Sequence, residues 1–285
     1  MYKKSNLDLR ILKKFFLNSF QKTLENSKPN IYLKKNIKKK NKNIIKILDD
    51  EIDLRKGKLF LIGWGKISGY LAKYLVEIIG KKNVNKGLII TNNKVVVSDN
   101  IKVLQGSHPF PSSKTFSSSK KLLKFIEEIK PNDYVISLIS GGGSSMLCIP
   151  SSNISLSEKK ELTKQLLIRG IQPKKINTIR KFMSQVKGGK LLKKINSKKI
   201  FNLLVSDENQ NLMHSIASGP TIIQKWDFKK VFNDLADKKI KKIVSKKLLN
   251  KIKVSAKKSK KEQSLSKTYE KIYFQSRKKN INNLI

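Results

Sequence analysis

Three consecutive glycines followed by two serines, Gly141 to Ser145, are the residues whose types and spacing most directly indicate chemistry. Glycines let the backbone adopt positive φ angles and let a ligand approach closely, while serine hydroxyl and amide groups donate to phosphate oxygens. The turn follows an apolar run, Tyr134 to Ile139, which is typical of a buried parallel strand. The pattern predicts a turn that binds an anion at a strand end, and a tight turn without a ligand is the alternative.

A second glycine turn carries a lysine. The apolar residues 59–62 lead into Gly63 and Gly65, and Lys66 follows directly. Helical spacing of apolar residues over 67–79 then predicts strand, turn and helix. The turn lacks the third glycine of a dinucleotide-binding fingerprint and is too short for a P-loop. Lys66 can reach a phosphate as a point charge, and a solvated lysine is the alternative.

Four further polar residues are candidates for a site. His108 lies in a proline-bracketed loop and is a candidate general base or substrate contact, with a locally hydrogen-bonded histidine as the alternative. Asn177 and Arg180 stand three residues apart, so one helix face presents both. Asp207 follows an apolar run, where an α/β enzyme holds a metal ion or a reacting hydroxyl. A helix N-cap is the alternative for Asp207.

The elements that must position these residues alternate between strands and helices. Four apolar strands run into Gly, Ser, Asp or Lys, which predicts an α/β fold with a three-layer, doubly wound, mostly parallel, Rossmann-like sheet. Its ligand crevice would lie at the carboxyl ends of the strands. Ser155 and Glu158 form a capping box at the start of one helix. We expect strands at 59–62, 87–91, 95–97, 102–104, 134–139 and 200–205, and helices at 67–79, 117–129, from Ser155 to Gly170 with Leu162, Leu166 and Leu167 on its apolar face, and at 176–182.

The flanking segments complete the expected organisation. Helical spacing of apolar residues predicts an amphipathic helix within residues 1–20, followed by a lysine-rich connection around 34–42. Another turn and helix are expected to begin at Lys187. We expect an α/β domain over residues 1–225 and a lysine-rich helical extension over 226–285.

The net charge of +43 raises the question of nucleic-acid binding. Only five of the 63 basic residues are arginine, the residue on which base recognition depends, and the lysines are spread along the whole chain. A general compositional bias toward lysine, asparagine and isoleucine is therefore favoured. We expect no specific nucleic-acid partner and only salt-sensitive attraction to polyanions.

The remaining composition indicates a cytoplasmic protein. The chain of 285 residues has a single cysteine, Cys148, which excludes an intramolecular disulfide and gives no metal-ligand spacing. No apolar run approaches the roughly 18 residues of a membrane-spanning helix, so no membrane partner is expected. The first 20 residues lack the apolar core and cleavage site of a signal peptide.

Several motifs occur in a defined order along residues 9–221. They are Gly63-Trp-Gly-Lys66, Gly106-Ser-His-Pro-Phe-Pro111, Leu138-Ile-Ser-Gly-Gly-Gly-Ser-Ser145, Ile176-Asn-Thr-Ile-Arg-Lys-Phe-Met-Ser184, Val186-Lys-Gly-Gly189, and Ser206-Asp207 with Ile216-Ala-Ser-Gly-Pro-Thr221. In these motifs the chain resembles the glycerate 2-kinase family, also called type II or hydroxypyruvate reductase-like glycerate kinases.

The resemblance implies transfer of the ATP γ-phosphoryl group to the 2-hydroxyl of D-glycerate, giving 2-phosphoglycerate and ADP with Mg²⁺. Lys66 matches the family's functional lysine, which stabilises charge on the transferring group. Chemistry and position add Arg180 and Asp207 as candidate catalytic residues, with Asp207 as the candidate metal ligand. The candidate substrate- and nucleotide-binding residues are Gly63, Gly65, His108, Ser140, Gly141, Gly142, Gly143, Ser144, Ser145, Asn177, Lys187, Ser218, Gly219 and Thr221.

The chain departs from the family pattern at four positions. A family glycine is replaced by Gln210 and a family acid by Asn211, which removes one negative charge beside the expected metal site. Ser112 stands where the family usually has aspartate, and Phe182 stands where it has histidine.

Family members also carry a second α/β lobe that supplies a functional arginine. Residues 271–277 resemble the strand and turn that open this lobe, and the sequence ends at Ile285. Three alternatives for this chain are therefore expected. It is half of a split enzyme that a second-lobe chain completes, a truncated remnant without catalytic activity, or a basic RNA-associated protein that has kept a kinase fold.

Overall fold

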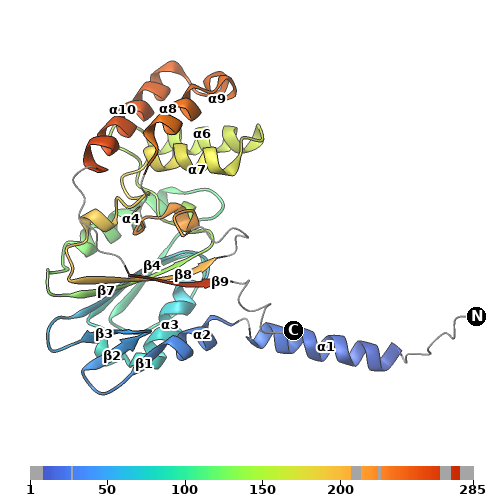
Figure 1. Ribbon diagram of the computed structural model, residues 1–285, viewed down its shortest axis with the longest axis vertical. Coiled ribbons are helices and arrows are strands. Elements are labelled where there is room, and N and C mark those ends of the chain that lie inside the picture. Colours follow the sequence, from blue (N-terminus) through green and yellow to red (C-terminus); the bar gives the residue numbers. More distant parts are fainter. Residues whose placement is uncertain (1–8, 27, 207–212, 224–225, 264–270, 277–285) are drawn as a thin grey trace, which may run out of the picture.

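The structure is a computed structural model, and it describes residues 9–26, 28–206, 213–223, 226–263 and 271–276. In its main sheet, six described strands pair in parallel in the order β6-β5-β4-β7-β8-β9 (Figure 1). The order reverses between β4 and β7, so the topological switch point of the sheet lies there. The strands are β4 (Leu59–Trp64), β5 (Lys86–Thr91), β6 (Ile101–Gln105), β7 (Tyr134–Ser140), β8 (Lys199–Ser206) and β9 (Lys271–Ser276).

Side chains of the central strands alternate between two core clusters, one on each face of the sheet. Phe60 and Ile62 pack in the cluster that includes α4 (Ser113–Ile126). Leu59 and Leu61 pack in the cluster that includes α3 (Ser68–Ile79). Every residue of β4 and β7 is buried, as a central parallel strand requires. The predicted α/β fold with helices on both faces of a parallel sheet is confirmed.

A three-stranded antiparallel sheet packs on the α3 side, where the sequence was expected to form a connection. This expectation for residues 34–42 was wrong: residues 34–36 end a helix and 37–39 form a strand whose Ile37 is buried, and Ile45 and Ile47 of the neighbouring strand are buried with it. The elements are α2 (Pro29–Asn36), β1 (Ile37–Lys39), β2 (Ile44–Ile47) and β3 (Asp50–Asp53).

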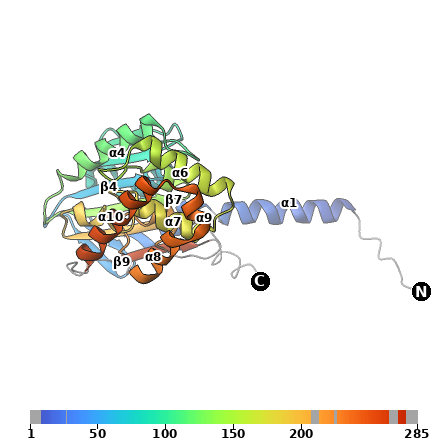
Figure 2. The same cartoon turned by 90° about the horizontal axis from the view of Figure 1, so that it is seen from above.

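Five helices form a layer with its own core, seen at the top of Figure 1 and from above in Figure 2. They are α6 (Leu156–Ile168), α7 (Pro173–Phe182), α8 (Phe228–Ala236), α9 (Lys238–Ile243) and α10 (Lys246–Gln263). The predicted capping box at Ser155 and Glu158 is confirmed at the start of α6. Residues after 226 thus share a core with α6 and α7, and the domain boundary at residue 225 stays a prediction.

The helix α1 (Leu9–Asn26) extends away from the body of the molecule in both views (Figures 1 and 2). The sequence predicted a helix here within residues 1–20, of which 1–8 lie outside the described residues. Its apolar side chains do not pack against the sheet, since Phe16 is 64% and Phe20 61% exposed. This helix therefore adds apolar surface and little burial.

Three smaller expectations were also corrected. Residues 95–97 do not form a strand; Val95 instead lies against Gly69 at the start of α3. The helix expected at 117–129 begins earlier, at Ser113, and ends at Ile126. The turn expected at Lys187 is present, but a short 3₁₀ turn, Leu192–Lys194, follows it in place of the expected helix. The short helical turns are η1 (Lys81–Asn83), α5 (Gly143–Met146), η2 (Leu192–Lys194) and η3 (Ile216–Ser218).

The part of the chain that the structure describes contains no helix with the length and apolar character needed to cross a bilayer.

Candidate functional site

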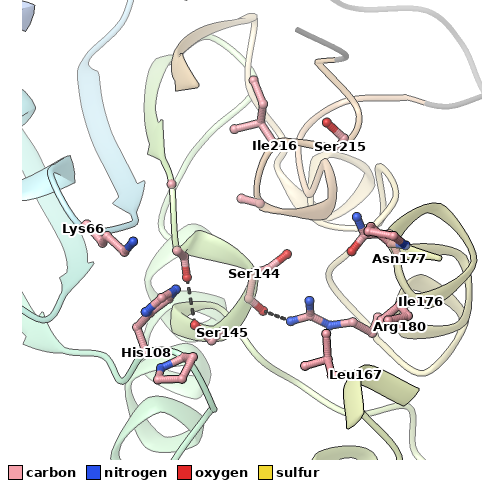
Figure 3. Close-up of a pocket in the computed structure, with 15 residues that line it drawn as sticks. Lys66, His108, Ser144, Ser145, Leu167, Ile176, Asn177, Arg180, Ser215 and Ile216 are labelled. Atoms are coloured by element: carbon pink, nitrogen blue, oxygen red, sulfur yellow. Dashed lines mark hydrogen bonds between the residues drawn. The ribbon is translucent and has the colours of Figure 1, made fainter. Parts of the chain in front are cut away.

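A cavity of about 310 Å³ opens at the carboxyl ends of β4 and β7, the switch point of the sheet (Figure 3). Ligands bind at this place in doubly wound folds, because loops from neighbouring strands diverge there. The cavity brings together five motifs that are distant in sequence. Its lining residues are Lys66, His108, Pro109, Gly141, Gly142, Ser144, Ser145, Leu167, Pro173, Ile176, Asn177, Arg180, Ser215, Ile216 and Ala217.

The glycine-rich turn after β7 forms one wall of the cavity. Gly142 has φ +78°, and a Cβ there would lie 2.9 Å from His108 Cδ2 and 3.0 Å from Lys66 Cγ. Only glycine fits both the conformation and the space. The amides of Gly142, Gly143 and Ser144 make no hydrogen bond with any described residue. Their N–H groups therefore remain available to an anionic ligand.

Lys66 is fixed through its backbone. Its amide donates to the carbonyl of Gly141 at 2.9 Å, which joins the two glycine turns. Its carbonyl accepts from Thr91 Oγ1 at 3.1 Å and from Asn93 Nδ2 at 2.6 Å. The side chain is left to point into the cavity, beside His108 (Figure 3). Among the described residues no carboxylate pairs with its ammonium group.

Arg180 and Asn177 enter the cavity from α7, on the other side of α5 from Lys66 and His108 (Figure 3). The predicted shared helix face is confirmed. Arg180 donates from one terminal nitrogen to the carbonyl of Ser144 at 3.2 Å. Its Nε is buried and has no hydrogen-bond partner among the described residues. Burial lowers the pKa of Arg180, and an anionic oxygen in the cavity would satisfy the unpaired donor.

Three buried lysines lie behind the part of the cavity wall that Arg180 and Ser144 form. Lys187 Nζ donates to the carbonyl of Ser144 at 2.7 Å and to that of Ala217 at 3.4 Å. Burial first, and then the charges of Arg180 and Lys159, hold the pKa of Lys187 well below its usual value. Burial likewise lowers the pKa of Lys159 to about 8. Lys181 Nζ donates to a backbone carbonyl, that of His214, at 2.8 Å.

The loop before Thr221 forms the third wall and is held in a strained conformation. Ala217 and Ser218 have φ of +51° and +65°, which side-chain-bearing residues rarely adopt. The hydroxyl of Ser218 hydrogen-bonds that of Ser144, so the loop and the glycine turn support each other. Such strain persists only where the surroundings enforce it, and it is concentrated at binding sites.

The structure places several predicted residues behind the cavity rather than on its wall. Ser140 is buried, and its hydroxyl accepts from the amide of Ile67 at 3.1 Å. Lys187 is fully buried and grips two backbone carbonyls. Asp207, the candidate metal ligand, lies outside the described residues. Other predicted residues absent from the lining are Gly63, Gly65, Gly143, Ser218, Gly219 and Thr221.

Metal binding has no support from the described residues. They contain no group of three or more His, Cys, Asp or Glu side chains placed to hold a metal ion. The described lining of the cavity also contains no carboxylate. Its donors and buried cations fit an anion such as a phosphate or carboxylate, and they do not by themselves form a Mg²⁺ site.

Pro173 and Ile176 line the cavity, although neither was among the predicted site residues. A signal was present, because Pro173, Ile176, Asn177 and Arg180 follow the spacing of one helix face. Leu167 was expected on the apolar face of α6, yet it is 52% exposed at the cavity.

The family model described as "Domain of unknown function (DUF4147)" matches residues 15–253. The chain belongs to this family. The D-glycerate 2-kinase of Thermotoga maritima is 34% identical over 169 residues, which are 59% of this chain and 40% of that protein. The glycerate 2-kinase of Pyrococcus horikoshii is 36% identical over 187 residues, 63% of this chain and 42% of that protein.

A solved structure agrees with these relatives. The crystal structure of a glycerate kinase from Thermotoga maritima superimposes with a TM-score of 0.71 and 25% identity, covering 94% of this chain and 59% of that one. The resemblance to the glycerate 2-kinase family is confirmed. The match spans about two fifths of the curated relatives' length.

Proposed function

We propose that the cavity binds ATP and D-glycerate and transfers the γ-phosphoryl group to the 2-hydroxyl of glycerate. One observation carries the proposal: Lys66, the Gly141–Ser145 turn and Arg180 line a single cavity at the switch point of the sheet. Phosphoryl transfer requires mainly positioning and neutralisation of charge, which backbone amides and unpaired cations supply. We infer glycerate as the substrate from the names of the relatives, which are glycerate 2-kinases.

In the proposed step the 2-hydroxyl oxygen bonds to the γ-phosphorus while the bond from phosphorus to the β–γ bridging oxygen breaks. The hydroxyl proton passes to a base, for which His108 is the candidate in the cavity, and ADP leaves. Lys66 stabilises charge on the transferring group, and the amides of the glycine turn hold phosphate oxygens. Asn177 and Arg180 hold the glycerate carboxylate.

Mg²⁺ enters this proposal as the ion that accompanies ATP as substrate. Asp207 is the candidate residue for placing that ion or the attacking hydroxyl, because it directly follows β8 in the sequence and β8 runs parallel to β7.

We further propose that full turnover uses a second lobe, corresponding to the part of the relatives' length that lies outside the match. The match spans 40% and 42% of two curated relatives, so more than half of each lies outside it. An arginine supplied from that remainder would add to Arg180 and Lys66. An arginine at a transferring phosphoryl group can contribute roughly 10³ to 10⁵ in rate.

The test is ADP release from ATP and D-glycerate, measured for the chain alone and with the remainder of the Thermotoga maritima relative added. Lys66→Ala should lower kcat at least about 100-fold, because the transferring charge loses its cation. The control is Lys73→Ala, an exposed lysine of α3, which should behave as wild type. Equal turnover by both variants would remove Lys66 from the mechanism. Absence of turnover by wild type under both conditions would refute the proposed activity.

A further inference from the structure

A second cavity, of about 570 Å³, lies between α10 and the segments that follow α5 and α7. It shares no lining residue with the first cavity. Its walls come from the loop 151–153, residues 184–185, Lys190, η2 and the last turns of α10. These segments are joined to one another: Gln185 Nε2 donates to the carbonyl of Pro150 at 2.8 Å, and the hydroxyls of Ser151 and Ser255 lie 3.4 Å apart.

The lining of this cavity is cationic and polar. Four of the twelve lining residues are lysines, five are serines, and the only apolar one is Val254. The lining contains no acidic residue. Lys194 and Lys258 have no hydrogen-bond or ion-pair partner among the described residues, although they come from different elements, η2 and α10.

One lysine is already ordered in the wall. Lys190 Nζ donates to the carbonyls of Lys181 at 3.1 Å and Ser184 at 2.8 Å, so its charge is held at a fixed position. Ser184 is buried and its hydroxyl donates to the carbonyl of Ile149 at 3.2 Å. A fixed cation with three further lysines in the same lining suits a ligand with more than one negative charge.

We propose that this second cavity binds a small, multiply charged phosphate compound. Lysine ammonium and serine hydroxyl groups both donate to phosphate oxygens, and several lysines at one hollow favour two or more phosphate groups over one carboxylate. The lining holds no aromatic side chain for a base to stack upon, so a nucleoside is disfavoured. The site stands independently of the proposed kinase activity.

The experiment is calorimetric titration of the full chain with inorganic pyrophosphate in about 0.15 M salt, where long-range attraction is largely screened. Lys193→Glu with Lys194→Glu should weaken binding at this site at least about tenfold. Lys81→Glu with Lys82→Glu is the matched control, because it reverses the same two charges on another exposed 3₁₀ turn, η1. It should bind as wild type. Lys66→Ala should also retain pyrophosphate binding in the second cavity, because Lys66 lines the other cavity.

Two results would overturn the proposal. Equal weakening by both double variants would mean that pyrophosphate affinity depends only on the net charge of the protein, as for non-specific binding of a polyanion such as RNA. Loss of all binding in Lys66→Ala would place pyrophosphate in the first cavity alone. Lys258→Gln, on a different element, provides a second variant if the charge reversal on η2 impairs folding, and it should weaken binding in the same titration.

Discussion

At the scale of single residues, the unusual feature is a set of buried cations that donate hydrogen bonds to backbone carbonyls. Lys159, Arg180, Lys181 and Lys187 donate to the carbonyls of Met183, Ser144, His214 and Ser144 respectively. Carbonyl dipoles compensate a buried charge only in part. Burial of these charges therefore costs the folded protein free energy.

This cost makes stability depend on pH through Lys159, whose folded-state pKa is about 8 against an ordinary value of 10.5. Below pH 8 the lysine is charged in both states and the full cost is present. As pH rises from 8 to 10.5 the folded protein has lost the proton while the unfolded chain still binds it. Wild type should therefore gain up to about 3 kcal/mol in free energy of unfolding relative to Lys159→Met over this interval.

The measurement is urea denaturation of wild type and variant at several pH values between 7 and 10.5. Lys160→Met is the control, because Lys160 is the exposed neighbour on the same helix and its variant should parallel wild type. Parallel curves for wild type and Lys159→Met would contradict the assignment of a buried, charged lysine.

The sequence predicted the residues that reach the cavity better than those that support it. Asn177 and Arg180 were predicted to share one helix face from their spacing, and both line the cavity. The position of Lys187 was not predictable. A lysine beside two glycines reads as exposed, and its burial depends on carbonyls of Ser144 and Ala217 that are far away in sequence.

At the scale of elements, the turn from β7 into α5 determines how closely Lys66 and His108 approach each other. Gly142 separates the two side chains with no Cβ of its own. Gly142→Ala should cost about 1 to 3 kcal/mol of stability from its positive φ and should also displace both side chains, lowering kcat/KM in the assay above.

Gly170→Ala is the control for this prediction. Gly170 also has a positive φ, of +64°, but a Cβ there would meet nothing within 4 Å. It should lose stability comparably and keep its activity. Equal activity in the two variants would show that crowding at Gly142 does not matter.

The elements that the sequence failed to predict are those whose packing partners are not local. Residues 95–97 are three valines in a row, a pattern typical of a strand, but Val95 packs on Gly69 of α3 instead of joining the sheet edge. The short strands β1 to β3 were missed because charged residues interrupt their apolar pattern, lysines in β1 and β2 and acidic residues in β3. Strands β4 and β7 were predicted because they are buried on both faces and need no partner to be recognised.

At the scale of the whole molecule, α1 stands outside the three core clusters. Phe16→Ser with Phe20→Ser should change the free energy of unfolding by no more than about 0.5 kcal/mol, because both rings lie on the surface. Leu71→Ala, on the buried face of α3, should cost about 2 to 5 kcal/mol. Urea denaturation measures both values. A cost at Phe16 and Phe20 equal to that at Leu71 would mean that α1 is packed in solution.

The pairing of β9 with β8 also sets an order of events during synthesis. β8 ends at Ser206 and β9 begins at Lys271, so the whole stretch containing α8, α9 and α10 is made between two adjacent strands. Distant pairings form slowly because the intervening chain must first be brought to order. A nascent chain emerging from the ribosome would therefore expose the unpaired edge of β8 until the helices and β9 have been translated. A chaperone that binds unpaired strand edges would have the longest time to bind at this edge.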